Sequence, residues 1–312
     1  MLRFAFSRLL VAIPTLFLVI TAAFFLMRAA PGGPFDTERP LPPEIERNIR
    51  AAYDLDKPLL HQYTIYLSKV LRGDLGPSIK IQDFTVNDLI AQGAPASIQI
   101  GLSAIILAFV LGTLLGTLAA LRHNSTADFS VMTLAMIGIV IPNFVMAPLL
   151  SLFFGVYLDW LPTSGWGDGG ELQYRILPIT ALALPQIAYI ARLTRGSMIE
   201  TLNANYIRTA RAKGLPERAV IIRHALKGAL LPVVSYLGPA MAFVLTGSVV
   251  IETIFSIPGI GRYFINAALN RDYPLVMGVV IVFALFIITL NFLVDIAYGY
   301  LDPKLRAQHT KR

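Results

Sequence analysis

Side chains that could carry out catalysis or bind a metal are few in this chain and lie far apart. The four histidines (His61, His123, His224 and His309) have no metal-ligand spacing, and cysteine is absent. No Gly-Lys pair occurs, so there is no phosphate-binding P-loop, and no Gly-x-Ser-x-Gly sequence offers a hydrolase nucleophile. We therefore predict no enzyme, no cofactor and no metal site.

The chemistry that the chain does offer is a concentration of positive charge. Residues 192–227 hold eight basic and two acidic side chains in 36 positions. The net charge of the whole chain is +7, but its charges lie between uncharged stretches, as membrane topology requires. Nucleic acid is therefore not the expected partner. A folded basic element on one face of a membrane protein predicts a docking surface.

The residue order of this basic segment predicts a fixed shape. Asn205 suits a helix N-cap, residues 206–213 give about two helical turns, and Gly214 suits the left-handed residue after a helix end. Pro216 fits the first turn of a second helix. The alternative is a basic loop attracted to anionic membrane lipid, which would need the charge but not this geometry. The predicted geometry therefore favours a short rigid helix that transmits force to the spans. The second helix is expected to continue into the next apolar stretch, with an apolar face made of Ile222, Leu226 and Leu230.

Six uncharged windows predict six membrane-spanning helices around this segment. The chain is 55% hydrophobic and 14% charged, whereas a soluble domain carries about 25% charged residues. A helix needs about 20 residues to cross the hydrocarbon core. The window 176–191 is short, and Arg175 and Arg192 are expected to snorkel along it; Pro95 suggests that the second span begins near Ala96. The windows are 9–27, 89–121, 129–158, 176–191, 228–251 and 273–294.

Lysines and arginines predict the orientation of these spans. With the N-terminus inside, the inner segments carry fifteen of them and the two short outer loops carry three. Both termini are therefore expected in the cytoplasm. The first window exceeds the apolar region of a signal peptide and lacks a small-residue cleavage site, so we expect it to be retained. Residues 28–93 would then lie outside, with amphipathic helices at 43–53 and 59–71 that either cap the membrane core or act as a spacer.

Polar residues within the windows are candidates for a translocation path. Since the windows carry no charged residue, energy is expected to come from a partner. Each polar residue has an alternative role in hydrogen bonding between helices, and Gly112-Thr-Leu-Leu-Gly116 favours helix packing within one subunit. The candidate path-lining residues are Gln99, Asn143, Gln186, Tyr236 and Asn291.

The turn after the fifth window is a candidate outer gate. It contains Glu252, Pro258, Gly259 and Gly261. Glycine and proline concentrated at one helix end are typical of a hinge, and a plain connecting turn is the alternative.

Several of these segments together resemble the permease subunits of ATP-binding-cassette (ABC) importers. More narrowly, the chain looks like the first, B-type membrane subunit of bacterial oligopeptide and dipeptide permeases, over essentially its whole length. The motifs that carry this resemblance are Asp74-Leu-Gly-Pro-Ser78, Arg195-Gly-Ser-Met-Ile-Glu200, Tyr206-Ile-Arg-Thr-Ala-Arg-Ala-Lys-Gly-Leu215, Arg223-His-Ala-Leu226, Ile251-Glu-Thr-Ile-Phe255, Pro258-Gly-Ile-Gly261 and Leu301-Asp-Pro-Lys304.

Two positions depart from the general permease pattern of Glu-Ala-Ala, three residues and glycine. Aligned on Gly214, that pattern falls on Arg208, Thr209 and Ala210, of which only the last keeps the general residue. Lys227 stands where a Leu-Pro pair would place its proline. The departure in the Glu-Ala-Ala pattern and the one at Lys227 both resemble the peptide-permease branch. No acidic contact is expected at Arg208.

The resemblance implies an all-α, six-helix membrane protein with the type I ABC importer permease fold. It divides the chain into an anchor helix with an external loop (1–93, helix 9–27), a permease domain (94–303) and a cytoplasmic tail (304–312). The resemblance also implies that the chain is a multi-pass protein of the bacterial inner membrane. The implied partners are a second permease subunit, two cytoplasmic ATP-binding subunits, an external solute-binding protein and a peptide. The residues implied to couple to the ATPase are Tyr206, Ile207, Arg208, Thr209, Ala210, Arg211, Ala212, Lys213, Gly214 and Leu215.

Other functions remain open at this point. Nickel and glutathione importers share this type of permease, so the cargo is less well defined than the class of transporter. An ATP-independent channel or carrier, or a scaffold without transport activity, would also fit a chain of membrane helices.

Overall fold

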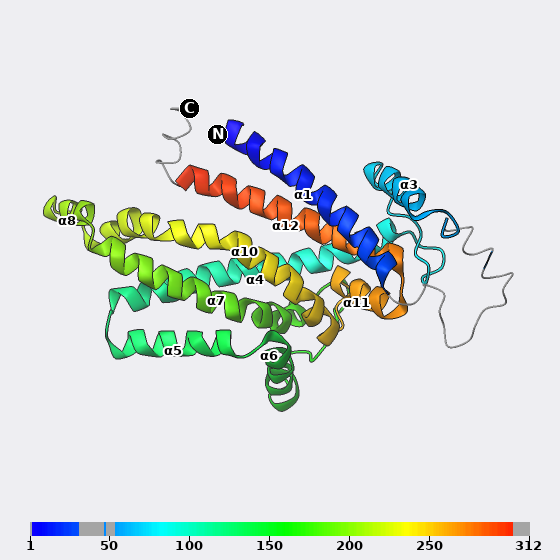
Figure 1. Ribbon diagram of the computed structural model, residues 1–312. Helices are drawn as coiled ribbons and strands as arrows, with labels where there is room; N and C mark the ends of the chain where they lie inside the picture. Colours follow the sequence, from blue (N-terminus) through cyan, green and yellow to red (C-terminus); the bar gives the residue numbers. More distant parts are fainter. Residues whose placement is uncertain (1, 31–46, 48–53, 302–312) are drawn as a thin grey trace.

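The chain folds as a bundle of long helices (Figure 1). The computed structural model describes residues 2–30, 47 and 54–301, and the regular structure in them is helical apart from one isolated bridge between Pro77 and Thr85. Five helices are long and apolar enough to cross a membrane, and a bent pair raises the number of candidate spans to six. The predicted all-α, multi-span architecture is therefore confirmed.

Five of the predicted windows lie inside these long helices. Helix α7 has 31 residues and extends beyond the window 176–191 at both ends, so it spans about 46 Å rather than being a short crossing. Helix α4 begins with a capping box at Thr85 and continues through Pro95. The five helices are α1 (Leu2–Ala29), α4 (Val86–Leu121), α7 (Leu172–Leu202), α10 (Leu226–Ile254) and α12 (Tyr273–Leu301).

The third predicted span is not one straight helix. Helix α5 (Thr126–Val140) and the following pair, α6 (Asn143–Leu150) and the π-helix η1 (Ser151–Tyr157), meet at an angle of 106°. The break lies at Ile141, whose ψ is 117°, and Pro142, whose ψ is 146°. A residue before proline is driven out of the helical region by the proline ring, so the prediction of a continuous helix over 129–158 is wrong.

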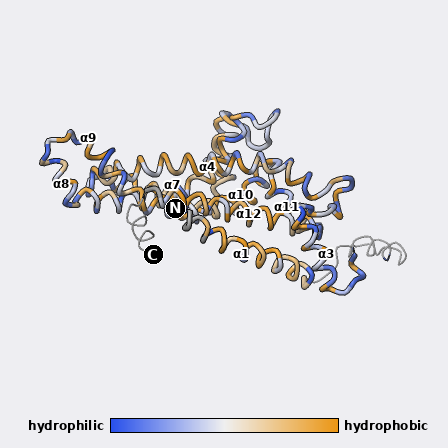
Figure 2. The backbone as a smooth tube through the Cα atoms, turned by 90° about the horizontal axis from the view of Figure 1, so that it is seen from above, coloured by the Kyte–Doolittle hydropathy of each residue, from blue (hydrophilic) through white to orange (hydrophobic). Residues whose placement is uncertain are grey.

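Apolar residues make up the middle of the bundle, and polar residues gather toward its two ends (Figure 2). Helix α1, for example, leaves Val11, Leu18 and Leu26 exposed. Such a surface suits lipid or another apolar helix.

Close packing of α4 on α7 forms the centre of the bundle. A Cβ added at Gly112 would lie 2.7 Å from the Cβ of Ile190, and one added at Gly116 would collide with the backbone of Ala191. The two glycines therefore let the helix backbones approach each other. The predicted packing role within one subunit is confirmed.

The bundle has two distinct ends, named here after their short helices. At the α8 end lies α8 (Asn205–Ala212), and there α1 begins and α12 ends, joined by an Arg8–Asp295 ion pair of 3.1 Å (Figure 1). At the opposite, α11 end lie α3 (Leu59–Leu71) and α11 (Ile260–Asn270).

Helix α3 packs against the last turns of α1. Phe24 stacks with Tyr66 at a centroid distance of 5.3 Å, and the Tyr63 hydroxyl lies 2.7 Å from that of Thr21. The predicted helix at 59–71 is thus confirmed. The predicted helix at 43–53 lies outside the described residues, apart from residue 47.

Candidate functional site

The segment 206–215, predicted to couple to an ATPase, forms a short helix and a tight turn. Ala204 is the N-cap of α8, with ψ of 150°, and Asn205 is already the first helical residue. The prediction of an Asn205 cap is therefore wrong by one residue. Gly214 has φ of +76°, and a Cβ there would meet no atom within 4 Å. The predicted left-handed glycine is confirmed, and its backbone conformation alone disfavours other residues.

Two apolar residues seat α8 on the ends of the long helices. Ile207 and Ala210 are buried in a cluster with Met198 of α7 and with Val220 and Ala225, which lie beyond the turn. The other eight residues of the segment are exposed, with Tyr206 at 50%. Because the buried residues recur at i and i+3, α8 has one anchored side and one exposed side that carries Arg208, Arg211 and Lys213.

An ion pair crosses the Gly214 turn. Arg211 donates from Nε to Oε2 of Glu217 over 3.1 Å and from Nη2 to Oε1 over 2.6 Å. This hydrogen bonding raises the pKa of Arg211 above its ordinary value. Exposed pairs add little stability, but a two-point contact restricts the angle between α8 and the next helix. Arg211 was named from the sequence among the residues that couple to the ATPase, and its pairing with Glu217 was not predicted.

The helix after the turn joins α10 through a π-helical insert. The helical stretch runs from Glu217 to Ile254 and includes α9 (Glu217–Ala219) and η2 (Val220–Ala225). The buried positions step by five, from Val220 to Ala225, and then by four to Ala229. Since a π turn inserts one residue, the predicted face on Ile222 is wrong: Ile222 is 53% exposed.

At the α11 end, the candidate gate residues gather around a buried carboxylate. Helix α10 continues past the predicted window and includes Glu252, which is 0% exposed. The Ser97 hydroxyl donates to Oε1 of Glu252 over 2.7 Å, and the Gly261 N–H donates to Oε2 over 2.8 Å. The Ile260 N–H in turn donates to Ser97 Oγ over 2.9 Å. The carboxylate therefore ties α10 to α4 and to the start of α11, and it lies one residue beyond the charge-free window 228–251.

Glycine is required on two sides of this carboxylate. A Cβ at Gly259 would collide with Glu252, and one at Gly261 would lie 2.5 Å from the Cα of Val249. Pro258 is exposed beside them. The structure thus brings Glu252, Gly259 and Gly261 into one cluster, together with Ser97, which sequence reasoning missed because it is distant in the chain.

A second buried carboxylate, Asp272, anchors residues 78–80 at the same end. It accepts from the Ser78 hydroxyl, from the Ile79 N–H over 3.2 Å and from the Lys80 N–H over 3.3 Å. It also accepts from the Leu275 N–H in the first turn of α12 over 3.3 Å, where a carboxylate suits the helix dipole. Residue 272 was not singled out from the sequence.

The five candidate path-lining residues do not form one row. The Tyr236 hydroxyl donates to Gln186 Oε1 over 2.9 Å, which joins α10 to α7. Asn291 donates to its own helix at Ile287 and faces Gly238. For the Gln186–Tyr236 pair, the structure thus contains the helix–helix bond that was the alternative to path lining.

Gln99 and Asn143 lie elsewhere. Gln99 is exposed and accepts from Arg175 Nη1 over 3.2 Å. Asn143 is half-buried at the start of α6 and faces Gly247 of α10. Their role in a path stays a prediction.

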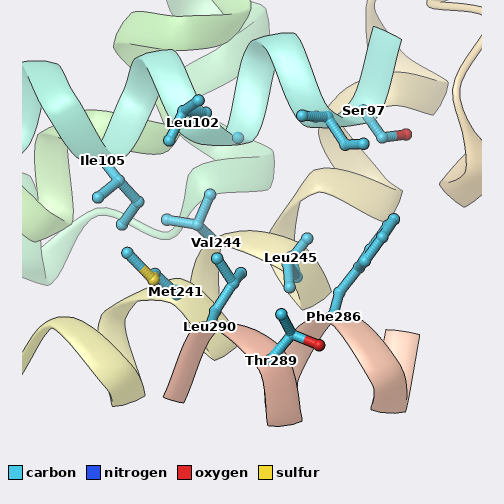
Figure 3. A pocket seen from close by; sticks show the side chains of 11 residues that line it. Ser97, Leu102, Ile105, Met241, Val244, Leu245, Phe286, Thr289 and Leu290 are labelled. Carbon is cyan, nitrogen blue, oxygen red and sulfur yellow. The ribbon is translucent and has the colours of Figure 1, made fainter. Parts of the chain in front are cut away.

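A cavity of about 240 Å³ lies between α4, α10 and α12 (Figure 3). Its walls are almost entirely apolar, and Ser97 of the Glu252 cluster stands at one edge. The five polar candidates are not among its lining residues, which include Leu102, Ile105, Met241, Val244, Phe286 and Leu290.

Comparisons with known proteins identify the family. Residues 112–307 match the family described as binding-protein-dependent transport system inner membrane component, and residues 1–80 match the N-terminal family of such membrane components. The chain is 55% identical over 306 residues to the oligopeptide transport system permease protein OppB of Escherichia coli strain K12, covering 98% of this chain and 100% of that one. It is 44% identical over 306 residues to the dipeptide transport system permease protein DppB of Bacillus subtilis strain 168, covering 98% of each.

A solved structure supports the same fold. A crystal structure of an amino acid ABC transporter with histidines aligns with a TM-score of 0.51 and 16% identity, over 69% of this chain and 94% of that one. At this identity the likeness concerns the fold alone. From the family matches and the full-length relatives, this chain belongs to the binding-protein-dependent transport system inner membrane component family.

Proposed function

We propose that this chain is the permease subunit of an ATP-driven importer of oligopeptides or dipeptides, and that it forms half of the translocation pathway. Family membership makes it a multi-pass inner-membrane subunit of an ABC transport system, without a catalytic ATPase domain of its own. The peptide cargo is supported by relatives named as oligopeptide and dipeptide permeases that match almost the full chain.

The observation that carries the coupling role is the construction of the segment 206–215. Its apolar side is anchored through Ile207 and Ala210, and its other side exposes Arg208, Arg211 and Lys213. A helix held in this way transmits a push from a bound protein to α7 and α10, whereas a flexible loop would absorb it. This segment would receive one cytoplasmic ATP-binding subunit.

The remaining assembly follows from the coupling role. A second permease subunit would pair with this chain, a second ATP-binding subunit would bind that permease, and an external solute-binding protein would deliver peptide at the α11 end. Both termini would lie in the cytoplasm, because α1 begins and α12 ends at the α8 end, where the basic residues concentrate.

The Glu252 cluster is the proposed outer gate. It joins α4, α10 and α11 beside the cavity lined by Ser97. A displacement of α10 relative to α4 would have to stretch or break the hydrogen bond between Ser97 and Glu252. In this proposal the hydrogen bond is intact when the outer end is closed.

Gly214→Val tests the coupling role. A β-branched residue at φ of +76° is strained, so the turn should change shape and peptide uptake by the reconstituted importer should fall below about a tenth of wild type. Gly169→Val is the matched control, because Gly169 has φ of +87° and open surroundings at a site away from the turn. Full uptake in Gly214→Val would contradict the proposal.

The same reconstituted system tests the cargo. Oligopeptide, dipeptide, glutathione and nickel are offered in turn, with and without ATP. We expect ATP-dependent uptake of peptides. Uptake of nickel or glutathione alone would reassign the cargo within the family, and uptake by the purified chain without ATP would support a channel or carrier.

A further inference from the structure

An ion pair between a buried aspartate and a half-buried arginine joins α5 to α7 near the α8 end. Asp128 in the first turn of α5 is 1% exposed. Arg195 of α7 donates from Nε to its Oδ1 over 2.6 Å and from Nη2 to its Oδ2 over 2.7 Å. The Asn124 N–H donates to Oδ2 over 3.0 Å, and His123 lies 3.5 Å away.

The geometry of the pair holds one helix at a set angle on the other. A buried carboxylate is costly unless its oxygens are satisfied, and here both oxygens accept from one planar guanidinium. Such a two-point contact fixes orientation as well as distance. The side chain of Asp128 also lies at a helix N-terminus, where negative charge is favoured.

Helix α5 is held against α7 a second time, nearer its other end. A Cβ at Gly138 would lie 2.9 Å from the carbonyl oxygen of Leu184, so the two backbones are in close contact there. Leu184 and Arg195 are eleven residues apart, or about 16 Å along α7. Two attachments at that separation make α5 and α7 one rigid body.

This body connects the segment 206–215 to the broken span. Met198, three residues after Arg195, packs in the same buried cluster as Ile207 of α8. At its far end, α5 stops at the 106° break before α6. A displacement of α8 would therefore travel along α7 and, through Arg195 and Asp128, reach α5 and the break.

We infer that the Asp128–Arg195 pair stays closed throughout the transport cycle and makes α5 move with α7, so that ATPase-driven motion of α8 reaches the broken span. Asp128 and Arg195 are positioning residues that act through helix geometry. The inference rests on the proposed coupling role of segment 206–215.

The first test breaks the pair in the complete transporter. Asp128→Asn and Arg195→Gln are assembled with the partner permease, the ATP-binding subunits and the binding protein in proteoliposomes, and peptide uptake and ATP hydrolysis are measured together. We expect assembly and hydrolysis to persist while uptake per ATP hydrolysed falls about tenfold. Asp168→Asn, an exposed aspartate in the loop before α7, is the matched control and should leave the ratio unchanged.

The second test replaces the pair with a covalent bridge. The chain has no cysteine, so Asp128→Cys with Arg195→Cys places the only two thiols at these positions. We expect low uptake per ATP in the unbridged double variant and recovery after a short bifunctional thiol reagent joins the two residues. The same reagent on either single variant should restore nothing.

The outcomes separate this inference from the function on which it rests. Unchanged uptake per ATP in Asp128→Asn, or arrest of transport by the covalent bridge, would overturn the inference. A wild-type complex that hydrolyses ATP but imports no peptide would overturn the proposed function instead.

Discussion

The two ends of the molecule hold their helices together by different chemistry. At the α8 end, carboxylates meet arginines from other segments, as in Asp128–Arg195 and Arg211–Glu217. At the α11 end, the buried carboxylates of Glu252 and Asp272 accept from hydroxyls and backbone N–H groups.

This difference follows from what each donor is attached to. A guanidinium sits at the tip of a long side chain, so it joins two helices while leaving their backbones regular. A backbone N–H belongs to the chain itself, so a carboxylate that binds several of them fixes a turn or a helix start. The α8 end is thereby suited to moving whole helices, and the α11 end to holding turns closed. Substitutions at Glu252, Asp272 and Arg211 test whether the two ends differ in this way.

Removing the Glu252 carboxylate should have the largest effect. Glu252→Ala leaves the Ser97 hydroxyl and the Gly261 N–H without their acceptor in a buried site, and each such loss costs about 1–3 kcal/mol. We expect the free energy of unfolding in detergent to fall by about 3 kcal/mol. Glu200→Ala, an exposed glutamate on α7, is the control; equal stability of the two variants would show that the carboxylate does not hold the α11 end.

Asp272→Ala should act locally and less strongly. It removes the acceptor of Ser78 and of the N–H groups of Ile79, Lys80 and Leu275. Because Ile79 is half-buried and Lys80 is exposed, water can replace part of what is lost, and we expect a cost of about 2 kcal/mol. Hydrogen exchange at Ile79 and Lys80 should accelerate, while exchange in α8 should stay at its wild-type rate. Faster exchange at both ends would argue that the two ends are not independent.

Arg211→Ala should have the smallest effect on stability. Arg211 and Glu217 are both exposed, and exposed pairs contribute little in water. We expect a thermal midpoint close to that of the wild type, together with a partial loss of peptide uptake because the angle at the Gly214 turn is less restricted. A drop in midpoint as large as that of Glu252→Ala would remove the distinction drawn between the ends.

Local sequence was sufficient for five of the spans and for the turn at Gly214. Uncharged stretches of sufficient length locate helices that cross a membrane, and five of them lie within the long helices of the structure. Gly214 was predictable because a left-handed residue after a helix end depends only on its own backbone. The break at Ile141 and Pro142 carried a local signal too, but the absence of charge over 129–158 favoured one continuous span.

Contacts between distant segments could not be predicted in the same way. Ser97 and Glu252 are 155 positions apart, and Asp128 and Arg195 are 67 apart. Sequence order gives no measure of which faces two helices turn toward each other. The π-helical insert at Val220–Ala225 illustrates the point, since one extra residue rotates the buried face and exposes Ile222.

The sequence by itself determined that this chain is a helical membrane protein with a folded basic element, because hydrophobic length, net charge and backbone preference are properties of short stretches. Only the tertiary structure decided which carboxylates are buried and what satisfies them. A buried charge is tolerated only where packing brings its partners into place, and that placement depends on the whole arrangement of helices.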